Sequence, residues 1–345
     1  MMTHPTVTQT SLMPNTILVT GASGFIGSHC VLDLLKQGYR VRGSLRDLSR
    51  SAFIESTLQA NGANTSELEW VVASLTEPES WHKASAGCDA IFHVASPVPT
   101  IQPKNPADVI EPARLGTLNV LEAAASQGIK RVILTSSVAA ILGGISESRV
   151  YTGEDWSDPD DPDMIPYAIS KTVAERAAWA FCEANGIALT TIHPALVLGP
   201  ALEADYGSSL EALVKLLRHE VPLLPRFGFE IVDVRDVAGL HRLALEHPDS
   251  VGQRLIAANG FLWFREIAAL LSENYPNHNI PQREMPNWLS RVASLFVREI
   301  GSFLNDLDVM KQLDNTPAMN LGWQPRTPQE AVLSGAKSLV DLGLV

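Results

Sequence analysis

The sequence predicts an α/β fold in which a doubly wound parallel sheet is joined to a smaller, mostly helical C-terminal lobe. Two observations predict it. Short apolar runs rich in β-branched residues alternate with amphipathic segments of helical length as far as Pro200, and a glycine-rich turn joins the first run to the first amphipathic segment. Such alternation is typical of βαβ units on a buried parallel sheet.

The first helix carries Ile26, Cys30 and Leu34 on one face and is expected to stop at Gly38. Later helices are expected over 51–60, 106–127 and 166–185, and strands over 15–20, 39–45, 68–73, 90–94, 131–134, 188–193 and 254–258. After Pro200 frequent prolines break the chain into shorter elements. We therefore expect a flexible tail over 1–14, a first domain over 15–199 with 231–260 returning to it, and a lobe made of 200–230 and 261–345.

Composition excludes several classes of function. With 46% hydrophobic and 19% charged residues, the 345-residue chain is typical of a folded globular protein. Its net charge of -12 disfavours nucleic-acid binding, which requires clustered Lys and Arg. No apolar run is long enough to span a membrane, and the polar first fourteen residues do not resemble a signal peptide.

The metal-binding residue types form no recognisable site. Cys30, Cys88 and Cys182 are odd in number and far apart, and the nine histidines are scattered. This pattern disfavours a disulfide framework and a metal site. We therefore expect three free thiols, no metal and a cytoplasmic location.

The glycine-rich turn has the features of a phosphate-binding loop. Gly21, Gly24 and Gly27 follow the first strand directly and open the first helix, with the spacing G-x-x-G-x-x-G. Glycines allow the backbone to turn sharply and approach a pyrophosphate, and the helix N-terminus supplies free N–H groups. In a βαβ context this pattern predicts a Rossmann fold that binds a dinucleotide.

The end of the second strand indicates which dinucleotide is bound. An acidic residue there would favour NAD, whereas an arginine can pair with the 2′-phosphate of NADP. The expected acidic position holds Leu45, and Arg46 follows it, which favours NADP(H). Arg50 is a candidate second phosphate contact. In the alternative interpretation Arg46 is only a solvated charge and Asp47 reaches the ribose.

A serine, a tyrosine and a lysine form a candidate catalytic group. Ser136 and Ser137 end the fifth strand, and Tyr167 and Lys171 lie four residues apart at the start of a helix, on one face of it. An ammonium beside a phenol lowers the pKa of the phenol, so Tyr167 could exchange a proton with a carbonyl or alcohol oxygen. Ser137 would hold that oxygen and Lys171 would also reach the nicotinamide ribose; Ser136 is the close rival of Ser137.

Taken together, these motifs resemble the extended short-chain dehydrogenase/reductase family, and within it the dihydroflavonol reductase and aldehyde (carbonyl) reductase group. The resemblance covers about 15–330 and rests on segments 20–28, 41–47, 87–97, 116–121, 135–137, 167–171, 193–200, 232–238 and 321–326. Their combination is far more specific than any one of them.

The resemblance implies further roles. Phe25 and Ile26 would offer backbone N–H groups to the pyrophosphate, and Ser137 aligns with the family's active serine. Other cofactor contacts would come from Ser23, Ala95, Ser96, Thr117, Pro194 and Val197. Where relatives have Asp-Leu near the adenine, this chain has Ser74-Leu75, which implies weaker adenine recognition. The Asn-Trp-Tyr stretch of cinnamoyl-CoA reductases reads Ile165-Pro166-Tyr167 here, which argues against a CoA thioester substrate.

The later lobe should supply the substrate pocket. Its Arg and Lys form no tight cluster suited to a diphosphate, so we expect a neutral, largely apolar aldehyde, ketone or alcohol. The main hypothesis is an NADP(H)-dependent carbonyl reductase, monomeric or homodimeric. The alternatives are an NAD-dependent nucleotide-sugar epimerase or dehydratase and a non-catalytic NADP-sensing protein. Candidate pocket residues are Ile141, Leu196, Tyr206, Leu210, Phe227, Met285 and Trp288.

Overall fold

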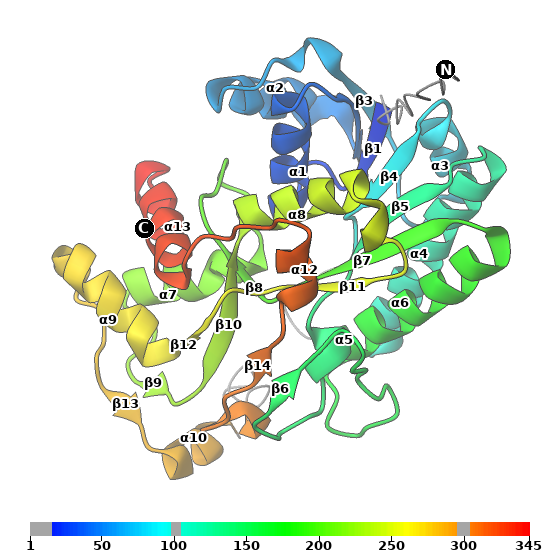
Figure 1. Ribbon diagram of the computed structural model, residues 1–345. Coiled ribbons are helices and arrows are strands. Elements are labelled where there is room, and N and C mark those ends of the chain that lie inside the picture. Colours follow the sequence, from blue (N-terminus) through cyan, green and yellow to red (C-terminus); the bar gives the residue numbers. More distant parts are fainter. Residues whose placement is uncertain (1–15, 98–104, 295–303) are drawn as a thin grey trace, which may run out of the picture.

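The computed structural model describes residues 16–97, 105–294 and 304–345, and the expected tail over 1–14 lies outside these ranges. Within them, seven parallel strands form the large sheet of Figure 1, in the order β11-β7-β5-β4-β1-β2-β3. The order reverses between β1 and β4, which is where α/β sheets bind ligands. The predicted doubly wound Rossmann fold is confirmed. The strands are β1 (Thr16–Thr20), β2 (Arg40–Leu45), β3 (Leu68–Val72), β4 (Ala90–His93), β5 (Arg131–Thr135), β7 (Ala188–Pro194) and β11 (Arg254–Ala257).

Helices cover both faces of this sheet because its central strands are apolar on both faces. In β1, Ile17 and Val19 belong to one buried cluster, whereas Leu18 between them belongs to another. The first cluster joins the sheet to α1 (Phe25–Lys36), α2 (Ser51–Ala60) and α8 (Val234–Glu246). The second joins it to α3 (Pro78–Ser85), α4 (Ala107–Ser126) and α6 (Pro166–Asn185).

A second core lies below and to the left of this sheet in Figure 1. The lobe around it was expected to be mostly helical, and it also contains small sheets, β12-β10-β8 and β13-β9. Its helices are α7 (Glu211–Leu217), α9 (Phe264–Asn274), α10 (Asn287–Ala293) and α13 (Pro328–Asp341). Its strands are β8 (Leu196–Leu198), β9 (Leu224–Pro225), β10 (Gly228–Asp233), β12 (Phe261–Trp263) and β13 (Glu284–Met285).

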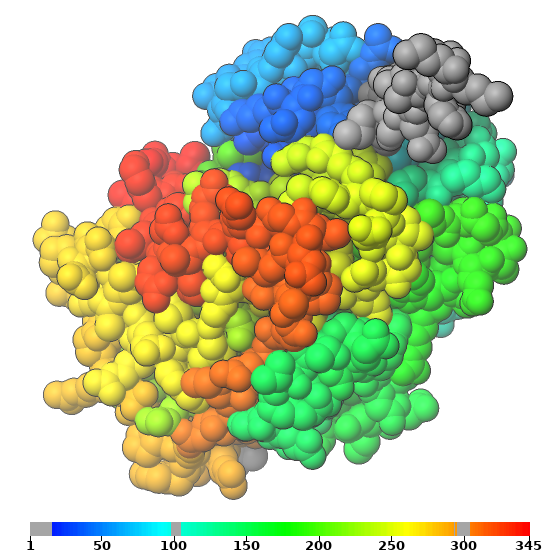
Figure 2. All heavy atoms as spheres, viewed as in Figure 1, coloured from blue at the N-terminus to red at the C-terminus, as the bar shows by residue number. Residues whose placement is uncertain are grey.

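The chain crosses between the two cores more often than the expected boundaries allow. Strand β8, in the range assigned to the first domain, pairs with β10 in the small sheet. Conversely, α12 (Thr316–Asn320), in the range assigned to the lobe, packs with Trp323 in the first core. Figure 2 shows this segment in orange beside yellow residues, and α12 contacts β11 of the large sheet. The division into a domain and a lobe stays a proposal.

Short elements complete the described chain. Helix α5 (Ala139–Leu142) follows β5 directly, and β6 (Val150–Tyr151) pairs with β14 (Gln312–Leu313). Single turns of 3₁₀ helix lie at Leu48–Arg50, Thr65–Glu67, Ser208–Leu210, Pro248–Ser250, Pro276–His278 and Leu304–Asp306.

Candidate active site

A cavity of about 1840 Å³ lies at the carboxyl edge of the large sheet, against the second core. This volume exceeds the 300–1,000 Å³ of an ordinary ligand pocket. It therefore has room for a dinucleotide and a second molecule together. The predicted site residues that line it are Gly21, Ser23, Gly24, Phe25, Ile26, Gly27, Arg46, Ser74, Leu75, Ala95, Ser96, Ser137, Tyr167, Lys171, Pro194, Val197, Leu196, Phe227 and Met285.

The glycine loop forms a cradle that larger residues could not form. Gly21 has a φ of +64°, and a Cβ on Gly27 would lie 2.1 Å from the Gly21 carbonyl oxygen. Helix α1 begins at Phe25 with no side-chain cap, so the N–H groups of its first turn have no partner within the helix. Such an end attracts an anion. These features fit the pyrophosphate of a dinucleotide.

The basic residues near the end of β2 differ in their surroundings. Arg46 lines the cavity and makes no ion pair with any residue that the structure describes. Asp47, its rival, caps the following turn by accepting from the Ser49 N–H at 2.9 Å. Arg50 does not line the cavity, and its guanidinium is paired with the carboxylates of Glu203 and Asp205. The expectation that Arg50 is a second phosphate contact is not supported by this placement.

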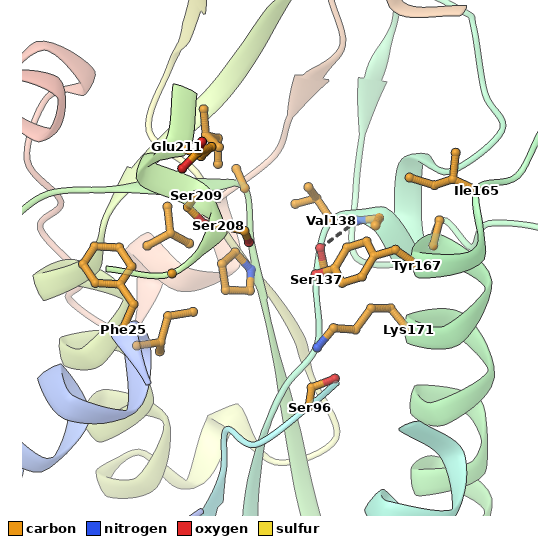
Figure 3. Close-up of a pocket in the computed structure, with 18 of the residues that line it drawn as sticks. Phe25, Ser96, Ser137, Val138, Ile165, Tyr167, Lys171, Ser208, Ser209 and Glu211 are labelled. Atoms are coloured by element: carbon orange, nitrogen blue, oxygen red, sulfur yellow. Dashed lines mark hydrogen bonds between the residues drawn. The ribbon is translucent and has the colours of Figure 1, made fainter. Parts of the chain in front are cut away.

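Ser137, Tyr167 and Lys171 converge on the cavity. Figure 3 shows Tyr167 and Lys171 projecting from α6 toward Ser137, with Phe25 and Ser208–Ser209 on the opposite wall. Pro166 at the first helical position starts α6 just before the tyrosine. The Lys171 Nζ atom donates to the Thr135 carbonyl at 3.4 Å and lies 6.0 Å from the centre of the Tyr167 ring. The structure therefore brings the three predicted residues together.

The protonation of this group differs from the expectation. Burial raises the pKa of Tyr167, and the hydrogen bond with Ser137 opposes that shift only in part. The Lys171 ammonium was expected to lower the pKa of the phenol, but it points past the ring toward the Thr135 carbonyl. Burial also lowers the pKa of Lys171, to about 8. At neutral pH Tyr167 is therefore a protonated phenol and Lys171 an ammonium.

The structure distinguishes Ser137 from its rival. The Ser137 Oγ accepts from the Ala139 N–H at 3.1 Å, which leaves its own proton free to hydrogen-bond with Tyr167. The Ser136 hydroxyl instead donates to the buried Glu175 carboxylate at 2.6 Å. Ser136 therefore anchors the strand end, and Ser137 is the serine that faces Tyr167.

This difference gives a first prediction. Ser137→Ala should lower kcat/KM for the expected carbonyl reduction about tenfold, the value of one hydrogen bond, and should lower the free energy of unfolding by only about 0.5–1.5 kcal/mol, because the Ala139 N–H loses a neutral acceptor. Ser136→Ala should lower the free energy of unfolding by about 1.5–3 kcal/mol, because it removes a buried bond to a charged group. Denaturant titration and steady-state kinetics on both variants would check this. The reverse pattern would show that Ser136 is the active serine.

Several candidate residues do not line the cavity. Ile141 is fully buried in a small core with Tyr151, and Leu210 is fully buried in the second core. Tyr206 does not line the cavity either, although its hydroxyl donates at 3.0 Å to Glu211, which does. Thr117, buried on α4, and Trp288, 68% exposed on α10, also lie outside the cavity wall.

Other lining residues were not foreseen from the sequence. The wall near Tyr167 is largely apolar, and much of it comes from segments that approach each other only in the fold. Phe227 stacks on Phe264 with ring centres 5.2 Å apart, and the Phe229 ring meets the Phe227 ring edge to face. The apolar residues not foreseen include Val138, Leu142, Ile165, Phe229, Phe261 and Phe264.

Comparisons with known proteins agree with this geometry. The profile of the NAD dependent epimerase/dehydratase family matches residues 17–257. The chain belongs to this family. The predicted resemblance to the extended short-chain dehydrogenase/reductases, and to their dihydroflavonol reductase and aldehyde reductase group, is thereby confirmed.

Individual relatives cover most of the chain. It is 35% identical to cinnamoyl-CoA reductase CAD2 of Medicago truncatula, over 79% of this chain and 85% of that protein. It is 32% identical to dihydroflavonol 4-reductase of Zea mays, over 78% and 76%. Among solved structures, the yeast methylglyoxal/isovaleraldehyde reductase Gre2 complexed with NADPH has a TM-score of 0.77, with 26% identity over 96% of this chain and all of that one.

Membrane-spanning helices and metal sites are both absent from the described residues. No helix there is long and apolar enough to cross a membrane. In the same part of the chain, no group of three or more His, Cys, Asp or Glu side chains could hold a metal ion.

Proposed function

We propose that this protein is an NADPH-dependent carbonyl reductase that converts aldehydes or ketones to alcohols. The observation that carries the proposal is the place of Ser137 and the protonated Tyr167. They lie in one cavity, between the glycine cradle and the apolar wall formed by residues such as Phe227 and Leu196. The family relatives whose names describe carbonyl reductases support it.

The residues of the chain have separate tasks in this reaction. When bound, NADPH supplies the hydride. The cradle of Gly21–Gly27 would hold its pyrophosphate, and Arg46 its 2′-phosphate. Ser137 and Tyr167 would hold the carbonyl oxygen, and the Tyr167 hydroxyl donates the proton that this oxygen gains. The phenol is already protonated, because burial raises its pKa, so the arrangement favours reduction over alcohol oxidation.

The cavity wall supports an apolar substrate. Near the second core it presents apolar and aromatic side chains, and Arg46 is the one arginine among the described residues of the wall. Three lysines line the wall as well: Lys171 belongs to the candidate catalytic group, Lys311 is paired with Asp306 at 2.5 Å, and Lys215 shares the wall with acidic residues such as Glu211 and Glu220. A diphosphate sugar would require a stronger set of cations than this. We infer a neutral aldehyde or ketone with a bulky apolar or aromatic group.

The test is turnover of NADPH by the purified protein. With a panel of aromatic and branched aliphatic aldehydes and ketones, the NADPH absorbance should decline and alcohol should accumulate. If no member reacts although NADPH binds, the proposal is wrong. Release of tightly held NAD from the denatured protein would instead support a nucleotide-sugar epimerase.

The pH dependence of this activity gives a second prediction. We expect Lys171 to hold the nicotinamide ribose as an ammonium, and burial lowers its pKa to about 8. Activity is therefore expected to fall as the pH rises through about 8. No fall is expected between pH 6 and 7, because burial lowers the pKa of His93 to about 3 and that of His241 to about 4. Measurement of kcat/KM from pH 6 to 10 checks this, since it reports groups of the free enzyme; a flat alkaline limb would contradict it.

A further inference from the structure

A buried carboxylate lies one helical turn beyond the catalytic lysine. Glu175 follows Lys171 by four residues on α6, so the two side chains share a face of that helix. Its side chain is only 1% exposed. The carboxylate accepts hydrogen bonds from Ser136 Oγ (2.6 Å), Arg254 Nε (2.7 Å), His193 Nε2 (2.8 Å), Thr191 Oγ1 (3.1 Å) and Trp179 Nε1 (3.2 Å).

These donors connect α6 to three neighbouring strands of the large sheet. Ser136 directly follows β5, His193 lies at the end of β7, and Arg254 begins β11. Two of the donors lie at the cavity: Ser136 lines it beside Ser137, and His193 directly precedes Pro194, which also lines it. A shift of this carboxylate would therefore move the catalytic serine relative to the catalytic helix.

Arg254 extends the same network to the loop before α6. Its guanidinium lies 3.6 Å from the centre of the Trp156 ring and donates to the Gly153 and Asp155 carbonyls at 2.7 and 2.5 Å. Buried ion pairs add little to stability compared with apolar residues of similar volume. The presence of Glu175 and Arg254 therefore calls for a role other than stability.

The charges around Lys171 indicate that role. The titratable groups that face its ammonium are His93 from β4, and Tyr167 and Glu175 from its own helix. His93 is neutral and Tyr167 is protonated near neutral pH. Although burial opposes its ionisation, His193 and Arg254 hold the pKa of Glu175 below its ordinary range. Glu175 is thus the anion that opposes the effect of burial on Lys171.

We propose that Glu175 is a positioning residue for carbonyl reduction, which fixes Ser137 through Ser136 and places a buried negative charge on the helix face that carries Lys171. The inference rests on the proposed function for its effect on turnover. The charge of Lys171 can nevertheless be measured without turnover, so the inference about Glu175 and the proposed reductase function can fail separately.

The experiment compares Glu175→Gln with Arg254→Gln in the full chain. Competitive acetylation across a pH series, followed by mass spectrometry, reports the pKa of Lys171, with the 70% exposed Lys337 as internal reference. The wild-type midpoint is expected at about 8. Glu175→Gln should lower it by about one pH unit or more, the effect of losing a nearby opposite charge. Arg254→Gln keeps the carboxylate and should leave the midpoint unchanged or raise it.

A purely structural network would give a different result. In that case both variants lose stability, and the acetylation midpoint of Lys171 either stays at its wild-type value or moves in the same direction in the two variants. Either outcome would overturn the proposal. If Glu175→Gln fails to fold because Arg254 is left unpaired, the double variant Glu175→Gln/Arg254→Gln removes both charges, and its midpoint should still fall. The alkaline limb of kcat/KM should move with the midpoint. A wild type without reductase activity would refute the proposed function and leave the acetylation result valid.

Discussion

Replacement of Tyr167 by phenylalanine is expected to lower kcat for carbonyl reduction about 10²- to 10⁴-fold, the usual contribution of a general acid. The change removes one oxygen atom and leaves the ring in place. The lost hydroxyl is the proposed proton donor, which hydrogen-bonds with Ser137, and burial keeps it protonated at neutral pH. No other described phenol lines the cavity, so no neighbouring tyrosine can replace it.

The affinity for NADPH should not change, because the glycine cradle and Arg46 are untouched. Equilibrium titration with NADPH and single-turnover kinetics would separate binding from chemistry. Tyr275→Phe is the matched control, since Tyr275 packs against the second core outside the cavity wall and should retain full activity. Retention of more than about a tenth of the activity by Tyr167→Phe would assign the acid to another group.

The large sheet could be predicted from the sequence because its signals are local. Each central strand is a short apolar run that is buried on both faces, and helices 51–60 and 166–185 were predicted with the bounds that α2 and α6 have. The small sheets could not be predicted. Strands such as β9 and β13 are two residues long and form through partners about sixty residues away, Leu224 with Glu284 and Pro225 with Met285.

In the candidate site, too, the features with local sequence signals could be predicted and those that depend on distant residues could not. Ser137, Tyr167 and Lys171 could be found because strand ends meet at one sheet edge and i, i+4 spacing fixes a helix face. The direction of the Tyr167 pKa shift could not, because it depends on burial by the whole fold. The ion pairs of Arg50 could not be predicted for a related reason, because its acidic partners, Glu203 and Asp205, lie about 150 residues later in the chain. Glu175 gave no signal, because four of its five donors lie on other segments that meet α6 only in the fold.

Replacement of Arg46 by glutamate is expected to lower the preference for NADPH over NADH about 100-fold or more. A hydrogen bond between charged groups contributes about 1.5–3 kcal/mol, and each 1.4 kcal/mol is tenfold in affinity. The glutamate would also repel the 2′-phosphate of NADPH and could accept hydrogen bonds from the ribose of NADH. Arg46 lines the cavity with no acidic partner among the described residues, so its charge is free to be used in this way.

Arg50→Gln is the matched control for that experiment. It removes a cation of the same type four residues later, but Glu203 and Asp205 already hold that guanidinium outside the cavity wall. The ratio of kcat/KM for NADPH to kcat/KM for NADH should therefore change strongly in Arg46→Glu and little in Arg50→Gln. An equal loss in both would mean that Arg50 leaves its acidic partners to reach the phosphate. A ratio unchanged in Arg46→Glu would mean that the 2′-phosphate is recognised by neutral groups near Ser44 and Ser74, which also line this end of the cavity.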